Sequence, residues 1–448
     1  MAEAPMAEQV LTRGMTTALS KEAVQALASH EAEWVGERRL EAWDAYEAAP
    51  MPTTKLEDWR YTDLRKKLDL DALSLASAVD GAVALPEAFA AAMREDREAA
   101  GRAVEIDGRV VSTELDPALA QQGVVMTSIR EALVNHAELL RKYLATHAVP
   151  ASAGKFQALN AALWTDGVLL YVPRGVKLEL PIRVSRWVSE AGTANFTRTL
   201  IIADKESQVS LVDEVLSDDF DRQTFYSSAV ELFAMDAAQV QYVSLQRMGR
   251  GAFHLTQQRT LANRDSTLDT LNVNLGATTA RVDLNAQLLG PGANSDMLGL
   301  YFADHDQHFD MSTSQDHVAP NARSDLLYKG ALDGKGRSVF RGIIKVHEQA
   351  QRTDAYQTNR NLLLSDQARA DSLPNLEIEA DDVRCSHGAT VGQLDAEALF
   401  YIMSRGMPRA RAERLVVLGF LGEVMSRLPL GGVVEKVTRS IEAKLAHD

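Results

Sequence analysis

The chain has 448 residues, of which 62 are acidic and 47 basic, so its formal net charge is −15. So acidic a surface argues against nucleic acid and anionic membrane as partners, because both are bound through clusters of Lys and Arg. Hydrophobic residues make up 46% and charged residues 24% of the chain, which predicts a large folded core and excludes extensive intrinsic disorder. The single cysteine, Cys385, excludes an internal disulfide and fits a reducing compartment.

The two ends of the chain predict a cytoplasmic protein. Met1 to Thr12 is acidic and lacks the apolar stretch of a signal peptide. The most apolar later run, Leu415 to Met425, contains two glycines and a glutamate and is too short to cross a bilayer.

Residues 1–104 are predicted to form an N-terminal helical domain. Ser20 is a suitable N-cap for a helix over 20–48, where apolar residues recur at helical spacing. The prolines in 49–52 end that helix, since proline has no amide hydrogen to donate. A second helical stretch is expected around 86–100.

Residues 105–392 are predicted to form a β core. Short runs of alternating or apolar residues, such as Val168 to Val172, are separated by Gly, Asn, Asp and Ser clusters, and helical periodicity is nearly absent. Within this stretch, small or polar residues followed by aspartate recur at Asp269, Asp296, Asp325, Asp354 and Asp371, separated by 27, 29, 29 and 17 residues. A recurring unit of this size favours a solenoid, in which each coil stacks on the next. A β-sandwich with similar turns is the alternative.

Residues 393–448 are predicted to be a C-terminal helical domain. Asp395 is a good N-cap, Gly406 ends the first helix and Pro408 suits the start of the next. The second helix has an apolar stripe flanked by arginines, which predicts either a cap on the β core or a docking site for a partner. The stripe consists of Val417, Leu421, Val424 and Leu428.

Two segments contain candidate metal ligands. Asp304, His305, Asp306, His308 and Asp310 form the densest cluster; alternation in a strand would place four of them on one face, but a solvated acidic surface is the simpler interpretation. Cys385 and His387 are two residues apart and therefore on one side of a strand. Thiolate and imidazole are ligands of iron–sulfur chemistry, yet a packed core cysteine beside a histidine gives the same pattern. Two ligands cannot hold a cluster alone.

The segment Asp381 to Gly392, with sequence DDVRCSHGATVG, resembles the SufB/SufD family of iron–sulfur cluster assembly proteins, and its SufD branch in particular. The resemblance is strong over 330–425 and clear near 50–65, where the chain reads EDWRYTD. SufB-type chains carry an essential cysteine in the segment corresponding to 357–360, which here has none. They also read His-Glu-Ala where this chain has His-Gly-Ala from His387 onward.

The resemblance implies a mainly β protein, with a right-handed parallel β-helix core flanked by N-terminal and C-terminal helical domains. It implies a non-enzymatic scaffold subunit in a complex with SufB and two copies of the ATPase SufC, the latter docked on the C-terminal helices. In the family, the histidine matching His387 lies at the SufB–SufD interface and contributes to the site where a transient, nascent Fe–S cluster forms. The cysteine matching Cys385 lies nearby.

Other assignments implied by the resemblance are less specific. Reduced flavin (FADH2) is associated with family complexes, but no residue here can be assigned to it. A homodimer is the alternative assembly for the isolated chain.

The competing functions are a SufB-like scaffold that acts without SufD and a carbohydrate-active β-helix enzyme. The enzyme would need paired carboxylates and aromatic platforms for sugars, and aromatic residues make up only 6% of the chain.

Overall fold

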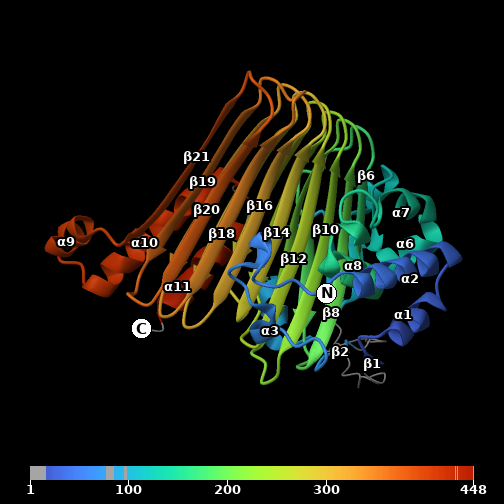
Figure 1. The fold of residues 1–448 in the computed structure, drawn as a ribbon, viewed down its shortest axis with the longest axis horizontal. Coiled ribbons are helices and arrows are strands. Elements are labelled where there is room, and N and C mark those ends of the chain that lie inside the picture. The colour runs from blue at the N-terminus through green and yellow to red at the C-terminus, as the bar shows by residue number, and fades with distance from the viewer. Residues whose placement is uncertain (1–16, 77–84, 95–97, 429, 431, 447–448) are drawn as a thin grey trace, which may run out of the picture.

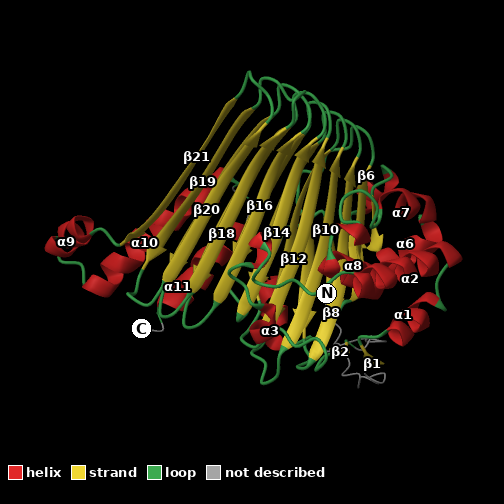
Figure 2. Ribbon diagram, viewed as in Figure 1, coloured by secondary structure: helices red, strands yellow, loops and turns green. Residues whose placement is uncertain are grey.

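The structure is a computed structural model that describes residues 17–76, 85–94, 98–428, 430 and 432–446. The prediction that Met1 to Thr12 is not a signal peptide concerns a segment outside the described residues. The chain winds into a parallel β-solenoid with helices at both ends, and successive strands alternate between two sheets (Figures 1 and 2). The predicted parallel β-helix with flanking helices is therefore confirmed.

The sheets consist of long strands in the solenoid and a few short strands near its beginning. One sheet has the order β1-β2-β8-β10-β12-β14-β16-β18-β20, with β6 beside β8 and β5 beside β6; the other has the order β21-β19-β17-β15-β13-β11-β9-β7-β3-β4. The strands are β1 (Thr17–Ala18), β2 (Ser74–Leu75), β3 (Gly101–Ile106), β4 (Arg109–Leu115), β5 (Val125–Ser128), β6 (Asp166–Val172), β7 (Ile182–Val188), β8 (Thr193–Ala203), β9 (Gln208–Ser217), β10 (Thr224–Ala234), β11 (Gln239–Arg247), β12 (Ala252–Ala262), β13 (Thr267–Asn274), β14 (Thr279–Leu288), β15 (Asn294–Ala303), β16 (His308–His317), β17 (Arg323–Leu332), β18 (Arg337–Val346), β19 (Asp354–Leu363), β20 (Arg369–Ile378) and β21 (Arg384–Gln393).

The aspartates that suggested a repeat form a stacked ladder over three coils. Asp296 on β15 pairs in register with Asp325 on β17, and its amide donates to the carboxylate of Asp269 at 3.0 Å. Asp354 pairs instead with Arg323, and Asp371 lies in the opposite sheet. The first three aspartates of the repeat therefore occupy equivalent positions in successive coils, as predicted. The last two, Asp354 and Asp371, do not lie in register with them.

The first N-terminal helices cover the outer face of the first strands of the 11-stranded sheet, whereas the last one, which contains Phe89, packs against Trp187 in the 10-stranded sheet. They are α1 (Lys21–Ala28), α2 (Glu33–Ala48), α3 (Leu64–Lys67) and α4 (Glu87–Arg94). Ser20 caps α1 as expected, but the predicted helix over 20–48 is broken between Ser29 and Ala32. The break lets α1 fold back on α2, where Gly36 packs against Ala28, and it places the carboxylate of Glu31 against the guanidinium of Arg39 at 2.6 Å.

Four helices that the sequence did not predict lie inside the stretch expected to be all β. They are α5 (Pro117–Gln121), α6 (Ile129–Asn135), α7 (Ala137–Tyr143) and α8 (Lys155–Leu163). Every residue of α8 from Phe156 to Leu163 is buried, against α2 and the outer face of β8 and β10. A helix that is buried on all sides has no polar face, so its 3.6-residue periodicity is hidden. The expectation of uninterrupted strand from 105 to 392 is wrong here, while the division into domains at 104 and 392 stays a prediction.

The motif EDWRYTD lies across the outer face of β14, β16 and β18. Asp58 pairs with Arg341 at 2.7 Å, and the Trp59 ring lies 3.8 Å from the guanidinium of Arg281. The hydroxyl of Thr62, which is fully buried, bonds both His308 and Asp310. These contacts tie the N-terminal region to the middle of the solenoid.

The C-terminal helices are α9 (Ala396–Ser404), α10 (Arg409–Arg427) and α11 (Val433–Leu445). Asp395 caps α9, as expected, by accepting from the amides of Glu397 and Ala398. The apolar stripe of α10 packs, together with α11, against the outer face of the 10-stranded sheet. Arg427 adds ion pairs to Asp296 at 2.6 Å and Asp325 at 3.0 Å. The stripe is therefore a cap on the β core.

Candidate functional site

The last coil of the solenoid has the least cover of any coil. β20 and β21 are the end strands of the two sheets, and among the described residues no further strand lies beside them (Figure 1). Leu376, Ile378 and Val391 are exposed apolar side chains of this coil, and Tyr356 on the neighbouring β19 is exposed as well. Both site residues predicted from sequence, Cys385 and His387, lie on β21.

Cys385 and His387 face the inner side of β21. In the parallel pairing of β19 with β21, Cys385 lies beside Ala355 and His387 beside Gln357. Ala355 and Gln357 are 1% and 0% exposed and lie between the two sheets. Residues paired in register project to the same side of a sheet. The two ligand-type side chains therefore point into the open end of the solenoid.

Cys385 is half-buried and has an apolar environment. It packs against a small cluster that contains Ile344, Val346 and Ala355. Burial raises the pKa of the Cys385 thiol above its usual value, and the nearby carboxylate of Asp354 adds to the rise, although a hydrogen bond with the Ala355 backbone opposes it. Because the thiolate is the nucleophile and the metal ligand, this thiol is held in its less reactive form.

His387 is exposed, and the side chain next to it in the stack is a buried amide. The Gln357 carboxamide lies flat against Gly342 on β18: a Cβ at position 342 would come within 2.4 Å of its oxygen. Neither the oxygen nor the nitrogen of this amide has a hydrogen-bond partner among the residues that the structure describes. The inner end of the last coil therefore combines an exposed imidazole with an unpartnered polar group beneath it.

No third ligand completes the pair. Within the described part of the chain, no group of three or more His, Cys, Asp and Glu residues is placed to hold a metal ion. The cluster at 304–310 is divided among ion pairs and hydrogen bonds: Asp304 pairs with Arg250 at 2.6 Å, Asp310 pairs with Arg281 at 2.5 Å, and His308 bonds Thr62. The possible metal site there is not formed, and Cys385 with His387 can supply only part of a ligand set.

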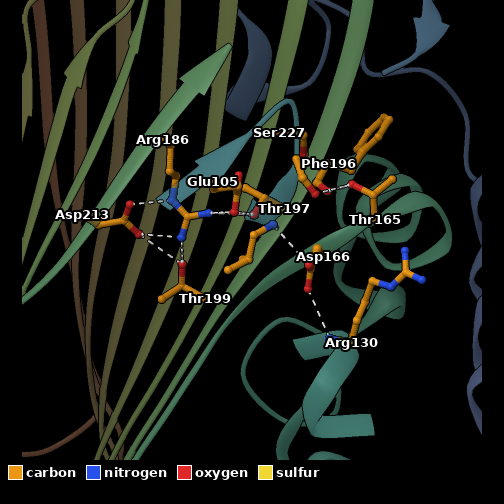
Figure 3. Close-up of polar contacts among 12 residues, drawn as sticks. Glu105, Arg130, Thr165, Asp166, Arg186, Phe196, Thr197, Thr199, Asp213 and Ser227 are labelled. Atoms are coloured by element: carbon orange, nitrogen blue, oxygen red, sulfur yellow. Dashed lines mark hydrogen bonds and ion pairs between the residues drawn. The ribbon is translucent and has the colours of Figure 1, made fainter. Parts of the chain in front are cut away.

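A second polar centre, which the sequence did not indicate, lies inside the first coils. Figure 3 shows the guanidinium of Arg186 on β7 between the carboxylates of Asp213 and Glu105. Its Nε–Asp213 distance is 2.6 Å, and it also donates to the hydroxyls of Thr197 and Thr199 at 2.8 and 2.7 Å. Burial raises the pKa of Glu105, although Arg186 opposes the rise.

This centre is sealed, so its role is structural. Arg186, Glu105 and Asp213 are 1%, 1% and 6% exposed. The carboxylate partners of Arg186 are 81 and 27 residues away in the sequence, so no local motif could have revealed the network. Its only sequence signal is a charged residue at one inward position of the strand IRVSRWV, where the other inward residues are Ile182, Val184 and Val188.

Two family models together match nearly the whole chain. The model described as "SUF system FeS cluster assembly, SufBD core domain" matches residues 186–420, and the "SufBD protein N-terminal region" model matches 15–184. The chain belongs to the SufBD family of iron–sulfur cluster assembly proteins. It is 30% identical to the Bacillus subtilis "Iron-sulfur cluster assembly protein SufD", with 97% of this chain and 100% of that protein covered. It is 28% identical to a Staphylococcus epidermidis "Iron-sulfur cluster assembly SufBD family protein", over 96% of this chain and 92% of that protein.

Membership of the SufBD family confirms the resemblance and assigns the chain to Fe–S cluster assembly in the Suf system. It removes the carbohydrate-active enzyme as an alternative. Among the described residues, no helix has both the length and the apolar composition needed to cross a membrane.

Proposed function

We propose that this SufBD-family chain is a non-catalytic, cytoplasmic scaffold subunit of the SufD type. It acts with a SufB-type partner and with SufC, whose ATPase activity the chain itself lacks. The nascent Fe–S cluster is the cargo, held briefly between this chain and SufB and then passed on. Supporting this, the chain is related over its full length to a Bacillus subtilis protein named SufD.

One observation carries the proposal for the site: Cys385 and His387 face the open end of the solenoid, with no third ligand near them in the described residues. Thiolate sulfur and neutral imidazole are both established ligands of iron in clusters. A pair of ligands cannot retain a cluster alone, so a partner that pairs with the end strands would supply the others. Incomplete ligation on each chain suits a scaffold, because a cluster held by four strong ligands would be released slowly.

SufC is proposed to dock on the C-terminal helices through α9. The apolar stripe of α10 is occupied by the chain's own β core, whereas α9 exposes three large apolar side chains, those of Phe400, Tyr401 and Met403. Phe400 and Tyr401 are 75% and 60% exposed, and beside them a groove of about 440 Å³ is lined by Leu364, Leu399, Met403 and Arg409, among others. Exposed aromatic and arginine side chains are enriched at energetically important interface positions.

The test is to express the chain with its SufB and SufC partners and to measure iron and acid-labile sulfide in the purified complex. His387→Ala should lower both severalfold while the complex stays assembled, because a ligand is lost from an exposed position. Cys385→Ser should have a smaller effect, since that thiol is half-buried and protonated. Ser386→Ala is the matched control, because Ser386 lies between them on the opposite face of β21. A stable His387→Ala complex with normal iron and normal maturation of client proteins would contradict the proposal.

A further inference from the structure

The carboxamide of Gln357 is the least satisfied polar side chain at the open end of the solenoid. The residue is 0% exposed, and neither Oε1 nor Nε2 has a hydrogen-bond partner in the described part of the chain. Most buried polar atoms in native proteins are hydrogen-bonded, so a fully buried amide with two free ends calls for an explanation. Other inward-facing amides in the last coils are bonded: Asn361 donates to Asn359 at 2.8 Å, and Asn359 donates to the hydroxyl of Tyr301 at 3.2 Å.

The position of this amide is set by two neighbours. Gly342 on the opposite sheet leaves room for it, since any Cβ at that position would collide with the carboxamide. His387 is its partner in register on β21, so the histidine side chain projects to the same side of the sheet as the amide, on the side of the open end. Gly342 in turn pairs with Pro374 on β20, which has no amide hydrogen and no polar side-chain atom to offer. The inward neighbours of His387 along β21, Cys385 and Ala389, offer no strong acceptor.

We propose that Gln357 is the positioning residue for His387: its carboxamide oxygen accepts the hydrogen of the inner ring nitrogen and leaves the outer nitrogen free to bind iron. This inference rests on the proposed function of His387. Metal-binding histidines almost always donate their second ring nitrogen to an acceptor, which fixes the tautomer and the ring orientation and raises the basicity of the ligating nitrogen. Gln357 is the group that the register places to do this.

The chemistry of a carboxamide suits the positioning of a histidine ring. A carboxamide is neutral, so it can be buried without the cost of a buried charge, and it can present either an acceptor or a donor. His387 is exposed, and its ring makes no hydrogen bond, ion pair or ring contact with the described residues, so the ring can turn between orientations. The amide then selects the orientation in which one nitrogen faces inward and the other faces the partner chain.

The test uses the full-length chain labelled with 15N-histidine. The signals of the His387 ring are assigned from the spectrum of His387→Ala. Gln357→Leu removes the amide at similar volume, and it should fold, because both lost polar atoms lack partners within the chain. The variant should change the tautomer populations reported by the ring nitrogen shifts of His387. In the complex with SufB and SufC, it should weaken iron retention by about 10-fold.

Gln258→Leu is the matched control, because Gln258 is a buried glutamine (1% exposed) on β12, far from the last coil along the solenoid. It should leave the His387 ring unchanged. Gly342→Ala is a second route, since it forces the Gln357 amide to move without changing that residue. It should change the ring signals in the same way.

The outcomes separate this inference from the proposed function. Unchanged ring signals in both Gln357→Leu and Gly342→Ala would overturn the positioning role, even if His387→Ala still loses iron. Changed ring signals with normal iron retention in both Gln357→Leu and His387→Ala would support the contact and reject the role of His387 in cluster assembly. An equal effect of Gln258→Leu on the ring would also overturn the inference.

Discussion

The first and last coils of the solenoid differ both in what covers them and in what lies between their sheets. Around the first coils, helices α1, α2 and α8 pack over Phe196, Phe225 and Phe253 on the outer face of the sheet. Between the sheets there, the charges of Arg186, Glu105 and Asp213 are fully enclosed (Figure 3). The last coil has bare strand edges, exposed apolar side chains and a neutral polar interior that ends in an exposed histidine.

The difference shows that buried polar side chains have two different roles in this fold. In the first coils the charges satisfy one another, so removing one of them leaves the others buried and uncompensated. Next to the last coil, the Gln357 amide of β19 is unsatisfied among the described residues, so it remains available to a neighbour. Substitutions in the first coils should therefore affect stability, whereas substitutions in the last coil should affect binding.

The largest effect on stability is expected from Arg186→Met. It leaves the carboxylates of Glu105 and Asp213 buried without their cation, and breaking a buried ion pair from one side typically costs about 3–5 kcal/mol. Urea denaturation of the purified chain would measure the loss. The triple variant with Glu105→Gln and Asp213→Asn should recover much of it, because no unpaired charge remains. If the Arg186→Met variant were as stable as the wild type, the network would be dispensable for stability.

A smaller, pH-dependent effect is expected from Asp166, which lies near this network at the start of β6. Burial raises its pKa to about 7, although hydrogen bonds from the amides of Gly167, Arg130 and Val110 oppose the rise. The folded state therefore holds this proton more tightly than the unfolded state does. Its contribution to stability is complete below about pH 4 and is lost as the pH rises through 7, a change of about 2 kcal/mol between pH 5 and 7. Asp166→Asn should remove that part of the pH dependence in denaturation curves measured across this range. An unchanged slope would contradict the assignment.

The smallest effect on stability is expected at the open end, from Phe400→Glu on α9. The side chain is 75% exposed, so unfolding free energy should change by no more than about 0.5 kcal/mol. Binding should respond strongly, because a charge is placed in the centre of the proposed SufC contact; co-purification with SufC should be lost. Glu397→Ala, on the same helix, is a suitable control. Full retention of SufC by the Phe400→Glu variant would place the docking site elsewhere.

The sequence predicted the features that depend on local chemistry. Ser20 and Asp395 were recognised as helix caps because a cap needs only a side-chain oxygen two or three residues before an amide. The coils were recognised because Asp269, Asp296 and Asp325 occupy equivalent positions in successive strands. Helix α8 was missed because burial on all sides removes the polar face that periodicity requires.

The candidate site was predicted only in part, because only its local features follow from the sequence. Cys385 and His387 are two residues apart, so their shared face follows from strand geometry. Gln357 is 30 positions before His387 and is brought beside it by the pairing of β19 with β21, which no local pattern specifies. The stripe on α10 could be recognised as apolar, but whether its own sheet or a partner covers it depends on the tertiary fold.

The edge of β20 has a consequence for how many chains can join. A bare strand edge is a template on which further strands could add without limit. Pro374 interrupts this edge because it has no amide hydrogen, and the acidic Glu377 and Glu379 beside it repel a second identical edge. The other end of the solenoid closes with the antiparallel strands β4 and β5 and with α6. Joining two molecules through their open ends would therefore use up this edge on both of them and leave it closed to a third strand.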